Sequence, residues 1–316
     1  MSYFLNKNVL VAGAAGLLGH ASVKRMLAEG AHVRATQHVR PVKITHKNLE
    51  IVNCDFFDTQ QCENVLEGID VVINCVAYVM GIAGQNENQL NLVKNNLIPS
   101  INLADACVRK KIDVFVNIGS STMYPSVTYA VKEEQGFEGD PFIGYQGIGW
   151  VKRFLEKSYM HYGNISTTKF VLLRSAAIYG PHDNFTPNKG HVIPDTIIKS
   201  ANKINPYYVW GDGTAVRDFV YVDDFVDGMV SAVEHKAFNN PINIATGVPT
   251  TIKTLVETTT KLCGYSPEII YDPTKPTAIP FRLINVEKAK TLLNWNSSTS
   301  LELGLEKTIN WYKENI

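Results

Sequence analysis

Residues 9–19 have the sequence Val-Leu-Val-Ala-Gly-Ala-Ala-Gly-Leu-Leu-Gly, a short apolar run followed by glycines at every third position. The apolar run predicts a buried parallel strand, and the apolar-rich residues that follow, up to Leu27, predict a helix. Gly13, Gly16 and Gly19 allow a tight turn, a close approach to a pyrophosphate and close packing of helix on strand. A tight loop in any α/β protein could contain such glycines, but the strand before them and the helix after them favour a dinucleotide site. We therefore expect Gly13, Gly16, Leu17 and Gly19 to bind a dinucleotide, with its phosphates at the helix N-terminus.

The overall composition limits the class of protein. The chain has 316 residues, 45% of them apolar, which is enough for one large domain or two unequal ones. Thirty basic residues balance thirty acidic residues, and this neutrality argues against a nucleic-acid or membrane-surface role. We expect no signal peptide, no membrane span and no metal site, because the first residues are polar, no apolar run is long enough and the cysteines form no CxxC pair. Five scattered cysteines on apolar segments indicate reduced thiols in a cytoplasmic protein.

The first half of the chain alternates short apolar runs with helical stretches. Strands are expected at residues 8–12, 32–36, 50–53, 71–76, 114–118 and 171–174, and helices at residues 17–29, 59–67 and 88–110. This alternation predicts an α/β fold of the Rossmann type, in which helices cover both faces of a doubly wound parallel sheet. After Pro181 prolines are frequent, strands become short, and separate helices are expected at residues 224–235, 252–263 and 301–312. We therefore expect a dinucleotide-binding domain at residues 1–180 and a smaller mixed substrate-binding region at 181–316, with some of its segments returning to the first domain.

The end of the second predicted strand bears on the choice between NAD and NADP. NAD-binding proteins usually have a carboxylate there, which accepts hydrogen bonds from the ribose hydroxyls. This chain has no acidic residue between Val33 and Arg40, and Gln37 stands near the expected position. His38 and Arg40 could face a 2′-phosphate, so we expect NADP rather than NAD. The alternative is a solvated basic turn.

Two further strand ends could contact the cofactor. Asp55 follows the third predicted strand, where it could accept a hydrogen bond from the adenine amino group or cap the next helix. Ala77 follows the fourth, in a segment whose small residues would let the backbone pass close to the cofactor.

Six motifs follow in the rest of the chain. They are Gly119–Pro125 (GSSTMYP), Tyr179–Phe185 (YGPHDNF), His191–Pro194 (HVIP), Val209–Thr214 (VWGDGT), Arg217–Asp224 (RDFVYVDD) and Asn243–Gly247 (NIATG). This series resembles the extended short-chain dehydrogenase/reductase family, and within it the branch of the GDP-L-fucose synthases. The resemblance covers nearly the whole chain. It implies an NADP-dependent 3,5-epimerase and 4-reductase that acts on a GDP-linked 4-keto-6-deoxy sugar, and a homodimer formed through the active-site helices.

The resemblance also implies catalytic roles, and the first departure from the family pattern concerns the proton donor. Family members take the proton for the new hydroxyl from the Tyr of a Tyr-x-x-x-Lys pair, while a Ser positions the carbonyl. Ser120 and Ser121 fit the Ser, and Lys152 fits the Lys that holds the nicotinamide ribose, but Ile148 then occupies the Tyr position. If Tyr145 is the catalytic Tyr instead, the Lys is missing. We prefer the first alignment, and two explanations stay open: Tyr145 reaches the site from its loop, or the reaction needs no Tyr.

The second departure is Thr122. Fucose synthases have a Cys there, which exchanges protons at the carbons beside the ketone, and a threonine hydroxyl does not titrate usefully. His191 matches the partner acid of that Cys, although a structural histidine is the alternative. Double epimerisation is therefore in doubt, while reduction, oxidation or a single epimerisation stays possible.

The resemblance places several residues on the substrate. Lys199, Arg217 and Arg282 fall where the family has cations for the nucleotide diphosphate, and phosphates favour clustered cations. Asn184 and Trp210 fit sugar or base contacts. Solvated charges, a loop cap and a core aromatic are the respective alternatives.

The sequence as a whole thus predicts an NADP-dependent nucleotide-sugar oxidoreductase or epimerase. Its partners would be a nucleotide sugar, GDP-linked by resemblance, and a second copy of the chain. The alternative is a protein that keeps both nucleotide sites and has lost catalysis, which the missing Tyr would explain.

Overall fold

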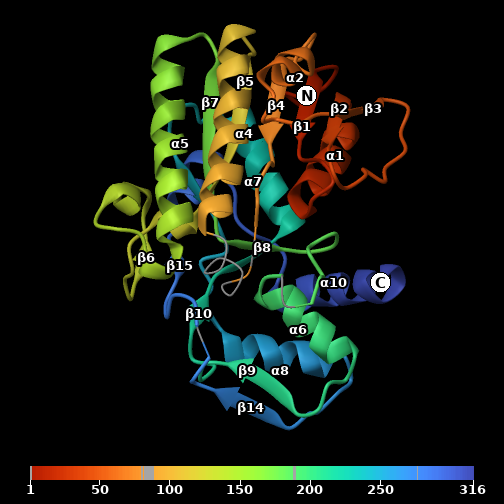
Figure 1. Cartoon of the computed structure of the whole chain (residues 1–316), viewed down its shortest axis with the longest axis vertical. Coiled ribbons are helices and arrows are strands. Elements are labelled where there is room, and N and C mark those ends of the chain that lie inside the picture. Colours follow the sequence, from red (N-terminus) through yellow and green to blue (C-terminus); the bar gives the residue numbers. More distant parts are fainter. Residues whose placement is uncertain (1, 80, 82–88, 188–189, 276) are drawn as a thin grey trace.

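The computed structural model describes residues 2–79, 81, 89–187, 190–275 and 277–316 (Figure 1). Its centre is a seven-stranded sheet with the strand order β12-β7-β5-β4-β1-β2-β3, in which every neighbouring pair is parallel. The strands are β1 (Asn8–Ala12), β2 (His32–Gln37), β3 (Leu49–Asn53), β4 (Val71–Asn74), β5 (Val114–Ser120), β7 (Lys169–Ser175) and β12 (Ile242–Ile244). The predicted doubly wound parallel sheet is therefore confirmed.

Helices cover both faces of this sheet, because side chains alternate along each strand and both sets are apolar. Val9 and Val11 face a core shared with α1 (Leu17–Ala28) and α7 (Val222–Glu234). Leu10 and Ala12 face a second core, shared with α2 (Thr59–Asn64), α4 (Gln89–Arg109) and α5 (Gln146–Ile165). Burial on both faces explains why the strands are continuous apolar runs in the sequence.

A smaller region lies beyond one end of the sheet (Figure 1). Helices α6 (Val192–Ala201), α8 (Ile252–Leu262) and α10 (Leu301–Asn315) share an apolar core there with Tyr179, Phe185 and Phe219. Two-stranded sheets complete it and connect it to the rest of the chain. They pair β8 (Ala177–Tyr179) with β11 (Phe219–Tyr221), β9 (Tyr207–Trp210) with β14 (Ile269–Asp272), β10 (Val216–Arg217) with β13 (Thr250–Thr251), and β15 (Leu283–Ile284) with β6 (Ala130–Val131). The remaining helix, α9 (Glu287–Leu293), packs against α7 and β12.

All six predicted strands of the sheet are present, and the differences are at the ends. The strand expected at 71–76 stops at Asn74, and the helix expected at 59–67 stops at Asn64. The seventh strand, β12, comes from the C-terminal half and pairs with β7 at the sheet edge, and α7 packs beside α1. The boundary near residue 180 stays a prediction, but these two elements show that the chain returns to the first half after it.

Two further findings concern the described residues only. None of their helices is both long and apolar enough to span a bilayer. No three His, Cys, Asp or Glu side chains among them are grouped so that they could hold a metal ion.

Candidate active site

The candidate site lies where the carboxyl ends of the parallel strands meet. β1 lies between β2 and β4, so the chain proceeds to β2 and β3 on one side while β4, β5 and β7 lie on the other. Such a switch point is where open α/β sheets bind ligands. Gly13, directly after β1, has a φ of +75°, and a Cβ on it would lie 3.0 Å from the carbonyl oxygen of Cys75, after β4. Residue 13 therefore has to be glycine for these two strand ends to come so close.

The next two glycines shape the start of α1. A Cβ on Gly19 would overlap the carbonyl oxygen of Gly13, so the helix packs on the turn only with glycine there. At Gly16 such a Cβ would make only ordinary van der Waals contacts, with the Gly13 carbonyl oxygen at 3.7 Å and Arg40 Nη2 at 3.8 Å. Gly16 provides no side-chain cap, which leaves the first helical N–H groups, from Leu17 onward, for another acceptor. These N–H groups and the nearby guanidinium fit the pyrophosphate of a dinucleotide.

The loop after β2 is held by Gln37. Its Oε1 accepts from the Val42 backbone N–H at 2.9 Å, and its Nε2 donates to Asn53 Oδ1 at 3.1 Å. His38 and Arg40, which this loop carries, are exposed. Gln37 thus holds the backbone of the loop on which these two basic residues lie.

The other two cofactor candidates lie beyond β3 and β4. Asp55 Oδ1 accepts from the Phe57 backbone N–H at 3.0 Å, whereas α2 is capped by Asp58, which accepts from two N–H groups of its first turn. The helix-cap alternative for Asp55 is therefore wrong. Ala77 is exposed in the segment after β4.

Three hydroxyl residues follow β5. Ser120 Oγ accepts from the Thr122 backbone N–H at 3.2 Å and from Thr122 Oγ1 at 3.0 Å. Both bonds use the oxygen of Ser120, so its own proton is free to be donated to a substrate carbonyl. Ser121 is half-buried in the same turn. The structure thus brings the predicted serines and Thr122 together at one strand end.

Helix α5 carries the residues of the altered Tyr-Lys pair. Lys152 Nζ donates to the backbone carbonyl of Ile118 on β5 at 3.2 Å, two residues before Ser120. Ile148 is buried one helical turn earlier. Tyr145, at the N-terminus of the helix, is half-buried, and its ring contacts Phe142 edge-on with a centroid distance of 5.5 Å.

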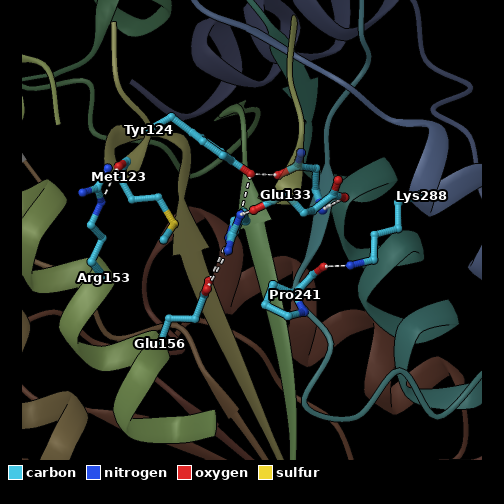
Figure 2. A network of polar contacts seen from close by, with 9 residues as sticks. Met123, Tyr124, Glu133, Arg153, Glu156, Pro241 and Lys288 are labelled. Atoms are coloured by element: carbon cyan, nitrogen blue, oxygen red, sulfur yellow. Dashed lines mark hydrogen bonds and ion pairs between the residues drawn. The ribbon is translucent and has the colours of Figure 1, made fainter. Parts of the chain in front are cut away.

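Tyr124, which follows the turn after β5, is bound in a buried polar network (Figure 2). Its hydroxyl donates to Asn243 Oδ1 at 2.6 Å and accepts from Arg174 Nη1 at 2.8 Å. Arg174 also forms a two-pronged ion pair with Glu156 of α5, at 2.9 and 2.7 Å. Burial raises the pKa of Tyr124 to about 12. Both hydrogen-bonding directions of the hydroxyl are occupied, so Tyr124 cannot replace the missing proton donor.

Two arginines of the smaller region lie together. The Val216 carbonyl accepts from the backbone N–H of Arg282 at 3.0 Å and from Arg217 Nη1 at 2.7 Å. Arg282 Nη2 donates to the Tyr124 carbonyl at 3.0 Å, but its Nε and Nη1 are buried and have no hydrogen-bond partner among the described residues. Burial lowers the pKa of Arg282 to about 10, while the Tyr145 phenol lies close enough to oppose the shift at both arginines. Buried charged donors are normally paired, so these unpaired N–H groups indicate a binding site for an anion.

The remaining substrate candidates differ in their surroundings. Lys199 pairs with Asp195 of its own helix at 2.8 Å and donates to the Tyr208 carbonyl at 3.2 Å, so its charge is already matched. Asn184 Oδ1 accepts from the Thr186 backbone N–H at 3.2 Å, as a loop cap does. Trp210 is 44% exposed, so the core-aromatic alternative is wrong.

Asp183 is a residue of this site to which the sequence analysis gave no role. Its Oδ1 accepts from the Asn184 backbone N–H at 2.7 Å, and its Oδ2 is buried with no partner in the part of the chain that the structure describes. Burial raises the pKa of this carboxyl, and His191 and Arg40 are the cations close enough to oppose the rise. His191, exposed at the N-terminus of α6, therefore lies near the carboxyl group of Asp183, which belongs to the Tyr179–Phe185 motif.

Comparisons with known proteins agree with this geometry. The chain is 28% identical to the GDP-L-fucose synthase of Escherichia coli K12, over 98% of this chain and 97% of that protein. It is also 28% identical to a dTDP-4-dehydro-6-deoxy-D-allose reductase of a Streptomyces species, over 97% and 96%. Among solved structures, the UDP-glucose 4-epimerase of Thermotoga maritima, bound to UDP-glucose, is similar with a TM-score of 0.88 and 25% identity, over 97% and 99%.

A sequence profile of the NAD dependent epimerase/dehydratase family matches residues 9–245. These residues run from the start of β1 to just beyond β12, so they include the glycine-rich turn, the serines after β5 and the lysine of α5. Members of this group are NAD(P)-dependent epimerases and reductases of nucleotide sugars. The chain belongs to the NAD-dependent epimerase/dehydratase family of extended short-chain dehydrogenases/reductases.

Proposed function

We propose that this protein is an NADP-dependent reductase of a GDP-linked 4-keto-6-deoxy sugar, within the wider class of nucleotide-sugar oxidoreductases and epimerases. The observation that supports the proposal is the pair of neighbouring arginines, Arg217 and Arg282, of which Arg282 has two buried N–H donors without a hydrogen-bond partner among the described residues. A nucleoside diphosphate supplies two adjacent phosphates, which two clustered guanidinium groups bind strongly.

The sugar and the base are proposed from the relatives. The fucose synthase supports a GDP-linked substrate, and the allose reductase supports a 4-keto-6-deoxy sugar with a different nucleotide. Trp210, exposed on β9, and Asn184 would contact the base or the sugar, and Lys199 would contribute less because Asp195 already neutralises it.

The cofactor is proposed to be NADP because of Arg40. Its guanidinium lies beside Gly16 and on a loop that contains His38 and no carboxylate, so a 2′-phosphate would meet cations only. Gly13, Leu17, Gly19, Asp55 and Ala77 would line the rest of the groove, and Lys152 would hold the nicotinamide ribose. When bound, the reduced nicotinamide supplies a hydride to the carbonyl carbon of the sugar.

The chain's own residues have the remaining tasks. Ser120, with Ser121 beside it, would donate a hydrogen bond to the keto oxygen and fix its position. His191, near the buried Asp183, would act as acid or base beside the sugar ring. Tyr145, close to both arginines, is a candidate for contacts with substrate.

The direct test is to follow the loss of NADPH absorbance with a GDP-linked 4-keto-6-deoxy hexose, and with its dTDP-linked counterpart as the comparison. We expect turnover with the GDP sugar. Arg282→Ala should raise the KM for the sugar by about 10- to 100-fold, since a charged hydrogen bond contributes about 1.5–3 kcal/mol. Lys199→Ala should change the KM much less. Equal KM values for the two variants, with both folded by circular dichroism, would reject the arginine site.

A second candidate function is a protein that binds both nucleotides without catalysis. The buried Ile148 in the Tyr position favours it. Tight binding of NADPH and of the nucleotide sugar, with no hydride transfer, would support this second function.

We also propose a homodimer formed through α4 and α5. Trp150 and Phe154, four residues apart on α5, are 49% and 57% exposed, and Leu90 on α4 is 88% exposed. The two helices pack on one another and lie side by side (Figure 1). Exposed apolar side chains on neighbouring helices are typical of a protein–protein interface. Sedimentation of the purified chain would show the dimer.

A further inference from the structure

In the preferred alignment, Ile148 on α5 occupies the position of the family's proton-donating tyrosine. Ile148 is 8% exposed and sits one turn before Lys152, where its aliphatic side chain offers no O–H. Tyr124 is occupied by Asn243 and Arg174. A carbonyl that receives a hydride still needs a proton, so another group has to supply it.

The surroundings of Lys152 suit a proton donor better than a lysine held in a structural ion pair. Within the described part of the chain its Nζ has one hydrogen bond, to the neutral carbonyl of Ile118 at 3.2 Å, which leaves two N–H directions for other partners. Its acceptor, Ile118, lies two residues before Ser120 on β5. The keto oxygen is proposed to lie at this end of the strand. The ammonium therefore lies at the strand end where the proton is required.

The charge on Lys152 is also poorly compensated. Burial lowers its pKa to about 8, and it is the one cause that acts on this group: none of the described carboxylates, arginines or histidines contributes. Without a carboxylate, the buried ammonium releases its proton more readily than an exposed lysine with a pKa of about 10.4. The residue as a whole is half-buried.

We propose that Lys152 is the general acid of this enzyme and takes over the role of the absent tyrosine. The inference rests on the proposed function, since it requires a keto sugar as substrate. The Nζ–H bond breaks and an O–H bond forms on the former carbonyl oxygen. With the hydride already assigned to the carbonyl carbon, the ketone becomes a secondary alcohol, and the neutral amine regains its proton from water.

The first test needs neither substrate nor cofactor. Competitive labelling of the chain with a small amine reagent at increasing pH, read by mass spectrometry, gives the pKa of each reachable lysine. Lys152 should reach half-maximal reactivity near pH 8, and Lys157, exposed on the same helix, is labelled in the same reaction as the comparison. A value for Lys152 at or above that of Lys157 would overturn the inference.

The second test is the pH dependence of reduction. The kcat/KM should fall about tenfold per pH unit above pH 8, because the protonated fraction of Lys152 falls as pH rises through its pKa. Lys152→Arg should move this decline to higher pH, and Lys152→Met should lower kcat about 100-fold or more while the Kd of NADPH, measured by fluorescence titration, changes less than tenfold. Lys157→Met is the matched control and should match wild type. Tyr145→Phe should leave the pH at which kcat/KM declines unchanged, whether or not its kcat changes.

The outcomes separate the two proposals. If the wild-type chain reduces no keto sugar, the proposed function fails and the inference fails with it. If the wild type is active and Lys152→Met keeps the same kcat and the same decline above pH 8, the inference alone fails. It also fails if Lys152→Met loses NADPH binding in proportion to its loss of activity, because Lys152 is then a cofactor-binding residue only.

Discussion

At the scale of single residues, Thr122 limits which reactions the site can catalyse. Its hydroxyl proton is donated to Ser120 Oγ at 3.0 Å, so the group is neither titratable at neutral pH nor free. Proton exchange at a carbon beside the ketone needs a base, and Thr122 cannot serve as one. Reduction at the carbonyl needs only a hydride and an acid. The local chemistry therefore favours reduction without double epimerisation, as in the named activity of the Streptomyces relative.

Arg40 should determine the choice between the two nicotinamide cofactors. Arg40→Ala should raise the KM for NADPH by about 10- to 100-fold and leave the KM for NADH within about threefold, because only the 2′-phosphate loses a partner. Steady-state kinetics with each cofactor measure the ratio. Lys43→Ala, a second exposed cation on the same loop, is the control. Equal effects on both cofactors would place the guanidinium on the pyrophosphate, near Gly16, instead.

Sequence spacing predicts residues whose role depends on the backbone, and it fails for residues whose role depends on burial. Gly13 and Gly19 are recognisable because their spacing imposes the turn and the close helix. The sequence motif that contains Asp183 does not indicate a role for it. Only the folded chain shows that its Oδ2 is buried and that His191 and Arg40 lie nearby. Arg282 was predicted as one cation among three, and only its unpaired buried donors distinguish it from Lys199.

At the scale of elements, α5 combines the reactive part of the site with its structural anchor. Lys152 lies one turn before Glu156, and Glu156 binds Arg174 of β7 in an ion pair with both side chains at most 2% exposed. Arg174 donates to the hydroxyl of Tyr124 (Figure 2). The backbone carbonyl of Tyr124 accepts from Arg282. The proposed acid and the proposed diphosphate arginine are therefore positioned by one polar network.

Breaking this network should cost much more than breaking a surface pair. Glu156→Gln should lower the free energy of unfolding by about 3 kcal/mol, because it leaves the Arg174 charge buried without its counter-charge. Urea unfolding followed by circular dichroism measures the change. Glu257→Gln makes the same substitution in the exposed pair with Lys253 and should stay close to wild type. A Glu156 variant as stable as that control would show that the pair is not needed for stability.

The elements themselves were predictable to different degrees. Strands such as β1 and β4 are continuous apolar runs buried on both faces, and their type follows from composition alone. β12 has three residues and lies in a region of short strands and prolines, so nothing local indicates that it pairs with β7. Its place is determined by the edge of a sheet already formed, which is a property of the whole fold.

At the scale of the whole molecule, the glycine-rich helix and the smaller region meet through a stack of aromatic rings. His20 of α1 stacks on His182, with ring centroids 3.5 Å apart, and His182 contacts Trp311 of α10 at 4.6 Å. His182 adopts a left-handed φ of 67° to reach this position. Burial, with His182 and Lys24 adding repulsion, lowers the pKa of His20 to about 4. The stack thus joins the two regions while its imidazoles are neutral.

Acid should therefore weaken the molecule through this stack. Between pH 6.5 and about 4 the unfolded chain binds a proton at residue 20 that the folded chain does not bind, so stability falls as pH falls across that interval. The raised pKa values of Asp183 and Asp218 act in the opposite direction, so the difference between variants is the informative quantity. Thermal unfolding of His20→Gln at several pH values should show a smaller loss of Tm on acidification than the wild type. His161→Gln, at an exposed site, should follow the wild type. Parallel Tm curves for His20→Gln and wild type would mean that His20 titrates alike in the folded and unfolded chains, and the stack would then be no obstacle to its charge.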